Sequence, residues 1–334
     1  MTDYPHCRDA WGYANDVRDG TIPSCKYIKL AVERFFADMD REDLTFNYDE
    51  VEKFCNFCGH LPHVKGKWAQ QQKRFDLEPW QKFKFANLFG FYRVSTGKRK
   101  YQECLNIIPR KNGKSIDAAA VGLYMLTSDN EFGSEVYCGA TSEKQANEVF
   151  TPAKRMLKSN PELMNFLDLS IQTQSIFRES DGAFFQRVIG DPPDGTSPHC
   201  GIVDEYHEHK KDAVYKTFQT GMGARENPLL YVITTAGDNI SGPCHEKVQE
   251  CIQILEGVLT DDHADSTLVL IYTIDDDAPE DFWKTEDALK MANPNYGVSI
   301  SADWLLKQQQ QAIRSAKDQG FFKTKHLNLW VNQT

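Results

Sequence analysis

Short apolar runs alternate with amphipathic stretches along the central part of the chain. Runs rich in Val, Ile, Leu and Tyr predict β-strands at about residues 102–108, 134–140, 200–204 and 229–234. Between them, the 3.6-residue period of helices predicts helices at about residues 114–127, 142–158 and 211–220. A repeated strand–loop–helix pattern is typical of a mostly parallel sheet with helices on both faces, so we expect an α/β core.

Both flanks of this core are predicted to be mainly helical. Before it, residues 24–40 place Ile28, Val32 and Phe35 on one helical face. After Pro243 the pattern predicts a helix, then a strand at 267–274, helices at about 280–292 and 301–318, and a final coil. We therefore expect three units, which are a helical N-terminal segment (1–75), the core (76–255) and a small C-terminal lid or linker subdomain (256–334).

One loop of the core has the composition of a phosphate-binding loop. Residues 107–115 read Ile-Ile-Pro-Arg-Lys-Asn-Gly-Lys-Ser, an apolar strand end followed by a polar loop that opens an Ala-rich helix. Backbone N–H groups in such a loop face phosphates, Lys114 can neutralise β/γ oxygens, and Ser115 can ligate Mg²⁺. A strict P-loop has Gly six residues before the lysine, where this chain has Ile108, so the motif alone is a weak signal.

Two adjacent carboxylates follow a second predicted strand. The run 200–203 is small and apolar and ends in Asp204 and Glu205. Acids at the carboxyl end of a buried parallel strand face the crevice where open α/β sheets bind ligands. Asp204 would then hold Mg²⁺ beside Ser115, and Glu205 could orient and deprotonate an attacking water. For the pair alone a solvated acidic turn is the better explanation, but the preceding Gly-Lys-Ser loop, in the right order along the chain, favours an ATPase.

Composition and charge limit the class of protein. The chain has 334 residues, and its 40% hydrophobic content permits a substantial core. No apolar run approaches the ~20 residues needed to span a bilayer, and residues 1–6 lack the pattern of a signal peptide. We therefore expect a cytoplasmic protein whose nine cysteines are thiols. A net charge of −10 argues against a protein that coats nucleic acid with its whole surface.

Several smaller groups of residues have alternative interpretations. Gln81 could pair with an adenine edge or simply lie in a helix start after Pro79. The basic cluster formed by Arg93, Lys98, Arg99 and Lys100 is interpreted as a solvated face rather than a DNA contact. Cysteine and histidine spacing at Cys55, Cys58, His60 and His63 suggests zinc, but a second cysteine pair at a suitable distance is missing. His207 and His209 could bind a metal, although a loop that senses nucleotide or contacts a neighbour is favoured.

Short motifs also occur in a characteristic order along the chain. They are Trp80-Gln81, Arg110 to Ser115, Ala140-Thr141 with Gln145-Ala146, Val203 to His207, Gly221 to Arg225, Ile233 to Gly237, Ala292 to Asn295 and Lys325 to Val331. This order resembles the large terminase subunit of tailed bacteriophages, over roughly residue 31 to the last residue. The resemblance accounts for Ile108, because these proteins commonly replace the first glycine of the P-loop.

The resemblance implies an ATP-driven DNA-packaging motor with a RecA/ASCE-like P-loop NTPase fold. It implies ATP and Mg²⁺ as ligands, and double-stranded DNA, the portal protein and the small terminase subunit as partners in the host cytoplasm. The motor would act as a homo-oligomeric ring, although the isolated domain could be monomeric, and no membrane is involved. The family normally continues into a nuclease domain, so we expect this chain, which stops at Thr334, to lack cutting activity.

The resemblance also implies roles for individual residues. Gln81 resembles the adenine-reading residue, Asp204 the Mg²⁺ carboxylate with Ser115, and Glu205 the catalytic base. Thr234 and Thr235 resemble the motif that couples hydrolysis to motion. Residues Arg110, Lys111, Asn112, Gly113, Lys114 and Ser115 would bind the phosphates, with Arg110 acting within the subunit. An arginine from the neighbouring subunit would complete the site, with Arg225 as the candidate and Arg187 as the runner-up.

Two other functions remain as alternatives at this point. A helicase-like or repair ATPase would share the P-loop and the acidic strand, but residues 243–334 show no second strand–helix series for another RecA-like lobe. A nucleotide-binding assembly protein without turnover would not need Glu205. The sequence therefore favours the packaging ATPase over both.

Overall fold

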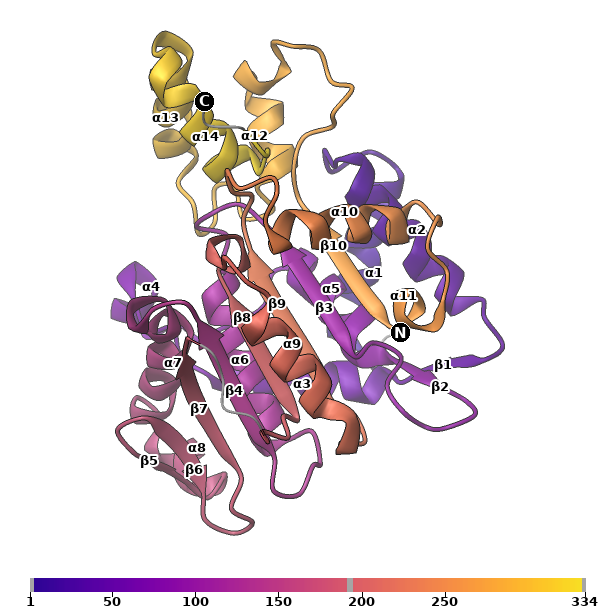
Figure 1. The fold of residues 1–334 in the computed structure, drawn as a ribbon, viewed down its shortest axis with the longest axis vertical. Coiled ribbons are helices and arrows are strands. Elements are labelled where there is room, and N and C mark those ends of the chain that lie inside the picture. The colour runs from indigo at the N-terminus through magenta and orange to yellow at the C-terminus, as the bar shows by residue number, and fades with distance from the viewer. Residues whose placement is uncertain (1–2, 191–194, 332–334) are drawn as a thin grey trace.

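The centre of the molecule is an eight-stranded sheet, with strand order β10-β3-β9-β8-β4-β7-β6-β5 (Figure 1). The computed structural model describes residues 3–190 and 195–331. Strands β10 to β7 in that order are parallel, whereas β6 and β5 are antiparallel additions at one edge. The strands are β3 (Glu103–Ile107), β4 (Glu135–Ala140), β5 (Leu169–Ile171), β6 (Ser175–Arg178), β7 (Phe184–Ile189), β8 (Cys200–Asp204), β9 (Leu229–Thr234) and β10 (Thr267–Ile271).

Helices cover both faces of this sheet. Gly122 on one helix lies against Phe185 and Ile202 on one face, whereas Gly139 and Gly201 lie against Phe218 of another helix on the opposite face. A Cβ at Gly201 would lie 2.8 Å from the Phe218 side chain, so glycine permits this close approach. The helices are α1 (Pro5–Arg18), α2 (Lys26–Met39), α3 (Tyr48–His60), α4 (Gly66–Gln70), α5 (Pro79–Gly90), α6 (Lys114–Thr127), α7 (Glu143–Lys158), α8 (Pro161–Phe166), α9 (Ala213–Gly221), α10 (Pro243–Leu255) and α11 (Asp262–Asp265).

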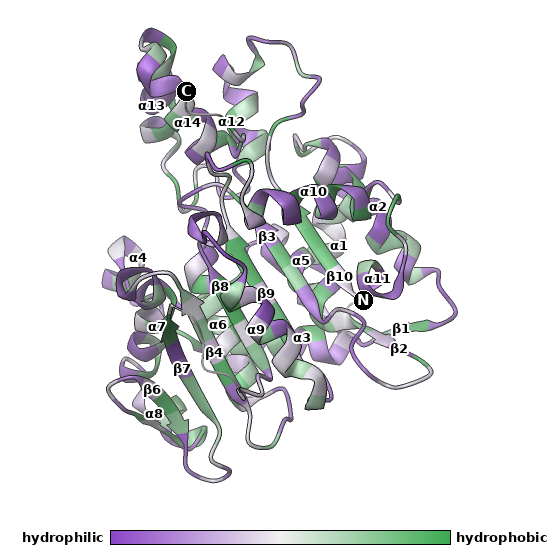
Figure 2. Ribbon diagram, in the orientation of Figure 1, coloured by the Kyte–Doolittle hydropathy of each residue, from purple (hydrophilic) through white to green (hydrophobic). Residues whose placement is uncertain are grey.

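The central parallel strands are apolar and buried along their whole length. Every residue of β3, β8, β9 and β10 is buried, and Figure 2 shows these strands as largely hydrophobic. Such continuous burial is expected where helices cover both faces of a parallel sheet. The N-terminal helices α1 and α2 contribute to this same hydrophobic core, and β1 (Leu44–Phe46) and β2 (Phe91–Arg93) form a separate two-stranded antiparallel sheet. Across the described part of the chain, no helix is both long and apolar enough to cross a membrane.

A second, smaller hydrophobic cluster belongs to the C-terminal helices. These are α12 (Glu286–Ala292), α13 (Ala302–Arg314) and α14 (Ala316–Leu327), and their cluster includes Trp283, Leu305 and Phe322. Figure 1 shows them beyond one end of the sheet. The backbone N–H of Arg110 donates to the Lys325 carbonyl at 3.0 Å, so these helices adjoin the P-loop.

The predicted strands and helices of the core are confirmed to within one or two residues at most ends, but the C-terminal prediction was partly wrong. The helix expected at 301–318 breaks at Ser315, which adopts an extended conformation (φ −127°, ψ 106°). The expected coil after it is the helix α14. The helix expected at 280–292 is a short 3₁₀ turn at Phe282–Lys284 followed by α12. The short strands β5 and β6 and the longer strand β7 were not predicted from the sequence.

The expected division into 1–75, 76–255 and 256–334 stays a proposal. Two packing facts bear on it: α1 and α2 share the core of the sheet, and β10 lies within the sheet beside β3. The outermost residues of the first and third units, 1–2 and 332–334, lie outside the described part of the chain.

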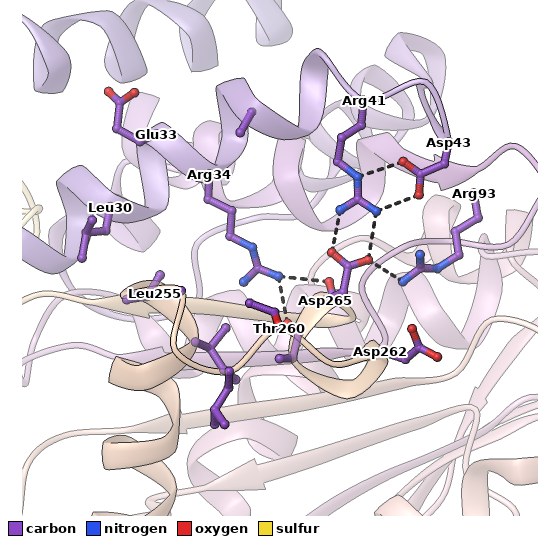
Figure 3. Close-up of a pocket in the computed structure, with 15 residues that line it drawn as sticks. Leu30, Glu33, Arg34, Arg41, Asp43, Arg93, Leu255, Thr260, Asp262 and Asp265 are labelled. Atoms are coloured by element: carbon purple, nitrogen blue, oxygen red, sulfur yellow. Dashed lines mark hydrogen bonds and ion pairs between the residues drawn. The ribbon is translucent and has the colours of Figure 1, made fainter.

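Asp265 ties the N-terminal segment to the edge of the sheet. Its carboxylate accepts hydrogen bonds from Arg41 at 2.6 Å and Arg93 at 2.9 Å (Figure 3). The Lys100 ammonium lies 3.3 Å from the same carboxylate. Burial alone would raise the pKa of Asp265, but the hydrogen bond from Arg41, the charge of Lys100 and the hydrogen bond from Arg93 hold it well below its usual range. The ionised carboxylate therefore stabilises the fold above its unfolded-state pKa, and this stabilisation is lost as the pH falls.

We expect Asp265→Asn to lower the free energy of unfolding at pH 7 by about 2 kcal/mol, measured by urea unfolding. This is below the range for fully buried pairs, because Asp265 is partly solvated. The difference between the variant and the wild type should shrink as the pH falls below ~4. Asp43→Asn is the matched control, since Asp43 is exposed and its side chain binds only Arg41 among the described residues. Equal losses in both variants would contradict a bridging role for Asp265.

Candidate functional site

The predicted P-loop connects β3 to α6 and has the backbone geometry of an anion-binding loop. Lys111 (φ 70°) and Gly113 (φ 87°) both adopt left-handed conformations, and Lys114 begins α6. Alternating left- and right-handed residues turn successive N–H groups towards one point, and the helix N-terminus adds its own donors. Gly113 is the N-cap of α6, and its positive φ favours a residue without a Cβ at this position.

The acidic pair follows β8 at the same edge of the sheet. Asp204 is the last residue of β8, and the strand β9 lies between β8 and β3. Glu205 adopts a left-handed conformation (φ 47°, ψ 49°), which is uncommon for a residue with a side chain and concentrates at functional sites. Asp204 Oδ2 is buried without a hydrogen-bond partner among the described residues, and Glu205 Oε2, which is also buried, lies 3.2 Å from His207 Nδ1 without a well-aligned hydrogen bond to it. Such atoms point to a missing cation or donor.

A cavity of about 610 Å³ joins the two motifs. Of the predicted site residues, six line it, which are Arg110, Lys111, Gly113, Lys114, Ser115 and Glu205. Lys144 and Glu148 of α7 line its far wall, and His63 and Lys65 line the side nearest α4. The structure therefore brings the P-loop and the candidate catalytic base onto one concave surface, as the sequence predicted. Asp204 lies buried beneath it.

The electrostatics of this surface are coupled. The ammonium of Lys114 donates to the carbonyls of Ile108 at 2.6 Å and Pro109 at 3.0 Å. Burial lowers the pKa of Lys114 to about 8, although the charges of Glu205 and Asp204 oppose this shift. Burial and the charge of Glu205 raise the pKa of Asp204 to about 8. A nearby anion would therefore raise the pKa of Lys114, and a nearby cation would lower the pKa of Asp204.

Thr234 takes part in a hydrogen-bond chain that the sequence did not reveal. The Thr234 hydroxyl accepts from the backbone N–H of His207 at 3.0 Å and lies 3.1 Å from His207 Nδ1. The Lys325 ammonium lies 3.2 Å from His207 Nε2, and burial together with the charge of Lys325 lowers the pKa of His207 to about 2. His207 is therefore neutral, and it connects β9 to the C-terminal helix α14. Thr235 is fully buried, and its hydroxyl has no partner among the described residues.

Asn112 is not directed into the cavity but is held by the C-terminal segment. Its amide nitrogen donates to Asn293 Oδ1 at 2.9 Å, and its amide oxygen accepts from the backbone N–H of Asn295 at 3.0 Å. The side chain of Asn328 bridges the sheet by donating to the carbonyls of Ile107 and Tyr272. These asparagines were recognised in the sequence only as family motifs, and their structural role is to bind the P-loop to the segment 293–328.

Gln81 lies next to the P-loop, lining a second cavity of about 310 Å³. This cavity shares His63, Gly113 and Ile116 with the larger one, so the two are contiguous at the P-loop. Gln81 is only 3% exposed, and its amide is already bound at both ends within the protein. Its position, beside Gly113, is compatible with the expected contact to a base.

The three candidate arginines lie in different places. Arg110 lines the cavity of about 610 Å³ between the P-loop and Glu205. Arg187 on β7 binds Asn147 at 2.6 Å and pairs with Glu143 of α7. Arg225 lies near the amino ends of the strands, where it pairs with Glu131 at 3.1 Å and with Glu135 at the start of β4. The P-loop and the acidic pair of the same subunit lie at the carboxyl ends of the strands, which is the opposite end of the sheet, so Arg225 does not reach them.

Two smaller sequence interpretations are also resolved. The basic cluster was wrongly interpreted as a solvated face, because Arg99 and Lys100 are buried and pair with Asp129 and Asp38. All nine cysteines are free and buried. Within residues 3–190 and 195–331, no group of three or more His, Cys, Asp or Glu side chains is arranged to hold a metal ion, so the zinc interpretation gains no support.

A larger cavity of about 680 Å³ lies away from both motifs. It contains Arg34, Arg41 and Arg93 near the amino end of β10, as Figure 3 shows. Arg41 and Arg93 are paired with carboxylates, and Arg34 donates to backbone carbonyls at 2.8 to 3.0 Å. The guanidinium groups of this cavity are therefore already bound within the protein, and its lining does not include the loop between β3 and α6, so we do not assign an anion-binding site to it.

Comparisons with known proteins agree with this geometry. Protein YmfN of Escherichia coli (strain K12) is 50% identical over 139 residues, covering 42% of this chain and 29% of YmfN. The terminase large subunit of Enterobacteria phage HK97 is 27% identical over 287 residues, covering 84% of this chain and 52% of that protein. The chain thus spans about half or less of the length of these curated relatives. The crystal structure of the HK97 large terminase has the same fold, with a TM-score of 0.69 at 23% identity over 84% of this chain and 55% of that one.

A family profile gives the most specific match. It is described as the ATPase domain of the terminase large subunit, and it matches residues 79–252, from the start of α5 to near the end of α10. The matched region contains Gln81, the P-loop, the acidic pair and Thr234. Because this match covers more than half of the 334 residues, the chain belongs to the family of terminase large subunit ATPase domains.

Proposed function

We propose that this chain is the ATP-hydrolysing motor domain of a phage large terminase and drives double-stranded DNA into a capsid. The observation that carries the proposal is the single cavity onto which Lys114, Ser115 and Glu205 all open. Family membership favours this function over a helicase-like or repair ATPase. In this proposal, the P-loop holds the triphosphate, Lys114 and Arg110 neutralise it, and Glu205 orients and deprotonates the attacking water.

We propose Mg²⁺ as the metal and Ser115 and Asp204 as its ligands. The buried and unpartnered oxygen of Asp204 supports this assignment, because hydroxyl and carboxylate oxygens are the donors that Mg²⁺ prefers. When bound, the ion would neutralise charge on the phosphate oxygens. The contiguous smaller cavity would hold the base beside Gln81.

We propose that hydrolysis is coupled to motion through Thr234 and Thr235. Loss of the γ-phosphate would change the surroundings of Glu205, whose Oε2 lies 3.2 Å from His207 Nδ1. His207 contacts both Thr234 and Lys325, so the change would reach the C-terminal helix α14. A contact chain of this kind can transmit a change only if the C-terminal helices have two arrangements.

We also propose that an arginine from a neighbouring subunit completes the site in a homo-oligomeric ring. Arg225 remains the candidate, because its position away from the site of its own subunit is compatible with a role in the next one. Arg187 remains the runner-up. The partners would be double-stranded DNA, the portal protein and the small terminase subunit, in the host cytoplasm.

Steady-state ATP hydrolysis over a range of protein concentration, with and without linear duplex DNA, tests the proposal. We expect turnover per subunit to rise with protein concentration and with DNA, because the trans arginine requires assembly. Activity independent of concentration would contradict the trans arginine and favour Arg110. An absence of hydrolysis under every condition, with Mg²⁺ present, would contradict the proposed motor function of this chain.

A further inference from the structure

A buried ion pair lies directly beneath the P-loop. Lys84 on α5 and Asp117 on α6 pair through Lys84 Nζ and Asp117 Oδ2, and their side chains are 1% and 0% exposed. The Lys84 ammonium also lies 4.5 Å from the ring centre of Phe85 and 5.1 Å from that of Trp80. Replacing a buried ion pair by apolar groups of similar volume is often neutral for stability, so stability alone does not explain this one.

The second oxygen of Asp117 holds Gln81. Gln81 Nε2 donates to Asp117 Oδ1 at 2.7 Å, and Gln81 Oε1 accepts from the backbone N–H of Glu78 at 2.8 Å. A carboxylate paired with an ammonium can only accept, and a backbone N–H can only donate, so the amide of Gln81 cannot turn over. One N–H and one oxygen lone pair of the amide remain for a ligand in the adjoining cavity.

We propose that the Lys84–Asp117 pair is a positioning device that makes the site select adenine over guanine nucleotides by fixing the direction of the Gln81 amide. This inference rests on the proposed function, in which Gln81 faces the base of ATP. At its 6-position adenine carries an N–H₂ donor, flanked by ring nitrogens that accept. Guanine carries an acceptor oxygen there, flanked on one side by an N–H donor.

The fixed amide distinguishes these two patterns. With its oxygen towards the 6-position, Gln81 accepts from the adenine amino group and donates to a neighbouring ring nitrogen. Guanine would place its O6 against the amide oxygen and leave both without a donor, which is costly in a buried site. An amide free to turn over would donate to O6 and accept the guanine N1–H. The selectivity for adenine over guanine therefore depends on the hydrogen bonds that keep the Gln81 amide from turning over.

The test compares the affinities of the full chain for Mg-ATP and Mg-GTP by calorimetry, with Mg-tripolyphosphate as a probe without a base. The main variant is the double substitution Lys84→Met and Asp117→Asn, which removes both charges and leaves an amide that can donate or accept. Lys84→Met alone is the second variant, because an unpaired buried Asp117 would take up a proton and could then donate as well. Urea unfolding establishes that each variant is folded.

The chain offers a matched control. Lys100 and Asp38 form another buried pair, with a distance of 2.5 Å and exposures of 0% and 4%, near the start of β3 and away from the P-loop. The double substitution Lys100→Met and Asp38→Asn removes an equivalent pair without touching Gln81.

We expect the wild type to bind ATP at least ~30-fold more tightly than GTP, because the fixed amide leaves the guanine O6 without a donor. Both Lys84 variants should reduce this ratio by at least ~3-fold, since only the backbone N–H of Glu78 then holds the amide in its direction. Tripolyphosphate affinity should stay within ~2-fold, because the phosphate contacts are untouched. The Lys100/Asp38 control should keep the wild-type ratio.

Several outcomes would overturn the inference. The first is an unchanged ratio of ATP to GTP affinity in folded Lys84 variants. The second is an equal fall of this ratio in the Lys100/Asp38 control, and the third is a wild type that binds both nucleotides equally. A wild type that binds neither nucleotide would overturn the proposed function as well, and tripolyphosphate binding separates these cases. Parallel losses of ATP, GTP and tripolyphosphate affinity would assign the pair a purely structural role.

Discussion

Glu205→Gln should hydrolyse ATP at least ~100-fold more slowly than the wild type while still binding it, because a positioned general base contributes a factor of this size or more. The substitution keeps the shape of the side chain and removes only its charge and basicity. Glutamine tolerates the left-handed backbone at residue 205 about as well as glutamate does, so the fold should be unaffected. Steady-state turnover and calorimetric titration with Mg-ATP measure the two quantities separately.

A neighbouring carboxylate supplies the control for this prediction. Glu208 follows in the same short turn, its side chain is 48% exposed, and its Oε1 lies 3.2 Å from His207 Nε2. Glu208→Gln removes the same charge from the same region but not from the cavity lining, so turnover should stay within ~3-fold of the wild type. Near-normal turnover in Glu205→Gln, or an equal loss in Glu208→Gln, would rule out Glu205 as the base.

The parts of the site that are contiguous in sequence could be predicted from it. Lys114 and Ser115 begin a helix after a strand, and Glu205 follows another strand, so the pattern of strands and loops placed them at one edge of a parallel sheet. The unusual conformation of Glu205 was not predictable, because a left-handed glutamate has no sequence signature. The left-handed residues of the loop are Lys111 and Gly113, so its backbone geometry does not depend on a glycine at position 108.

The parts of the site that depend on distant residues could not be predicted. Asn112 and Asn293 are 181 residues apart, and His207 and Lys325 are 118 residues apart. A single sequence carries no signal for such pairs until the fold has brought the C-terminal helices onto the P-loop. The break at Ser315 has the same origin, because the polar stretch around it has no glycine or proline to end a helix and the packing of α13 on α14 decides the boundary.

The position of Gln81 near the start of a helix could be predicted from the sequence, but the direction of its side-chain amide could not. Glu78 is the N-cap of α5, and the Gln81 side chain three residues later accepts from its backbone N–H, as in a capping box. The sequence predicts either an adenine contact or a place in a helix start for Gln81, and neither prediction gives the direction of its amide. The capping box and Asp117 together explain why this amide has one orientation, which is a property of three residues rather than of one.

Lys114→Met should bind Mg-ATP roughly 100-fold more weakly than the wild type, because charge-assisted hydrogen bonds are worth up to about 3 kcal/mol and 1.4 kcal/mol is a tenfold change. The ammonium donates to the carbonyls of Ile108 and Pro109. These are neutral acceptors in a buried place, and the lowered pKa of Lys114 shows that they compensate its charge poorly. A triphosphate would offer charged acceptors instead, so much of its affinity should depend on this one side chain.

The same argument distinguishes lost binding from lost folding. Methionine retains the length of the lysine side chain and removes a charge that is costly to bury, so the free energy of unfolding should change by less than about 1 kcal/mol. Lys29→Met, on an exposed position of α2, controls for the loss of one positive charge and should leave the affinity unchanged. An affinity for Mg-ATP that is the same in Lys114→Met and the wild type would mean that the loop 108–113 does not hold the phosphates. In that case the left-handed conformations of Lys111 and Gly113 would serve only to seat Asn112 against the C-terminal helices.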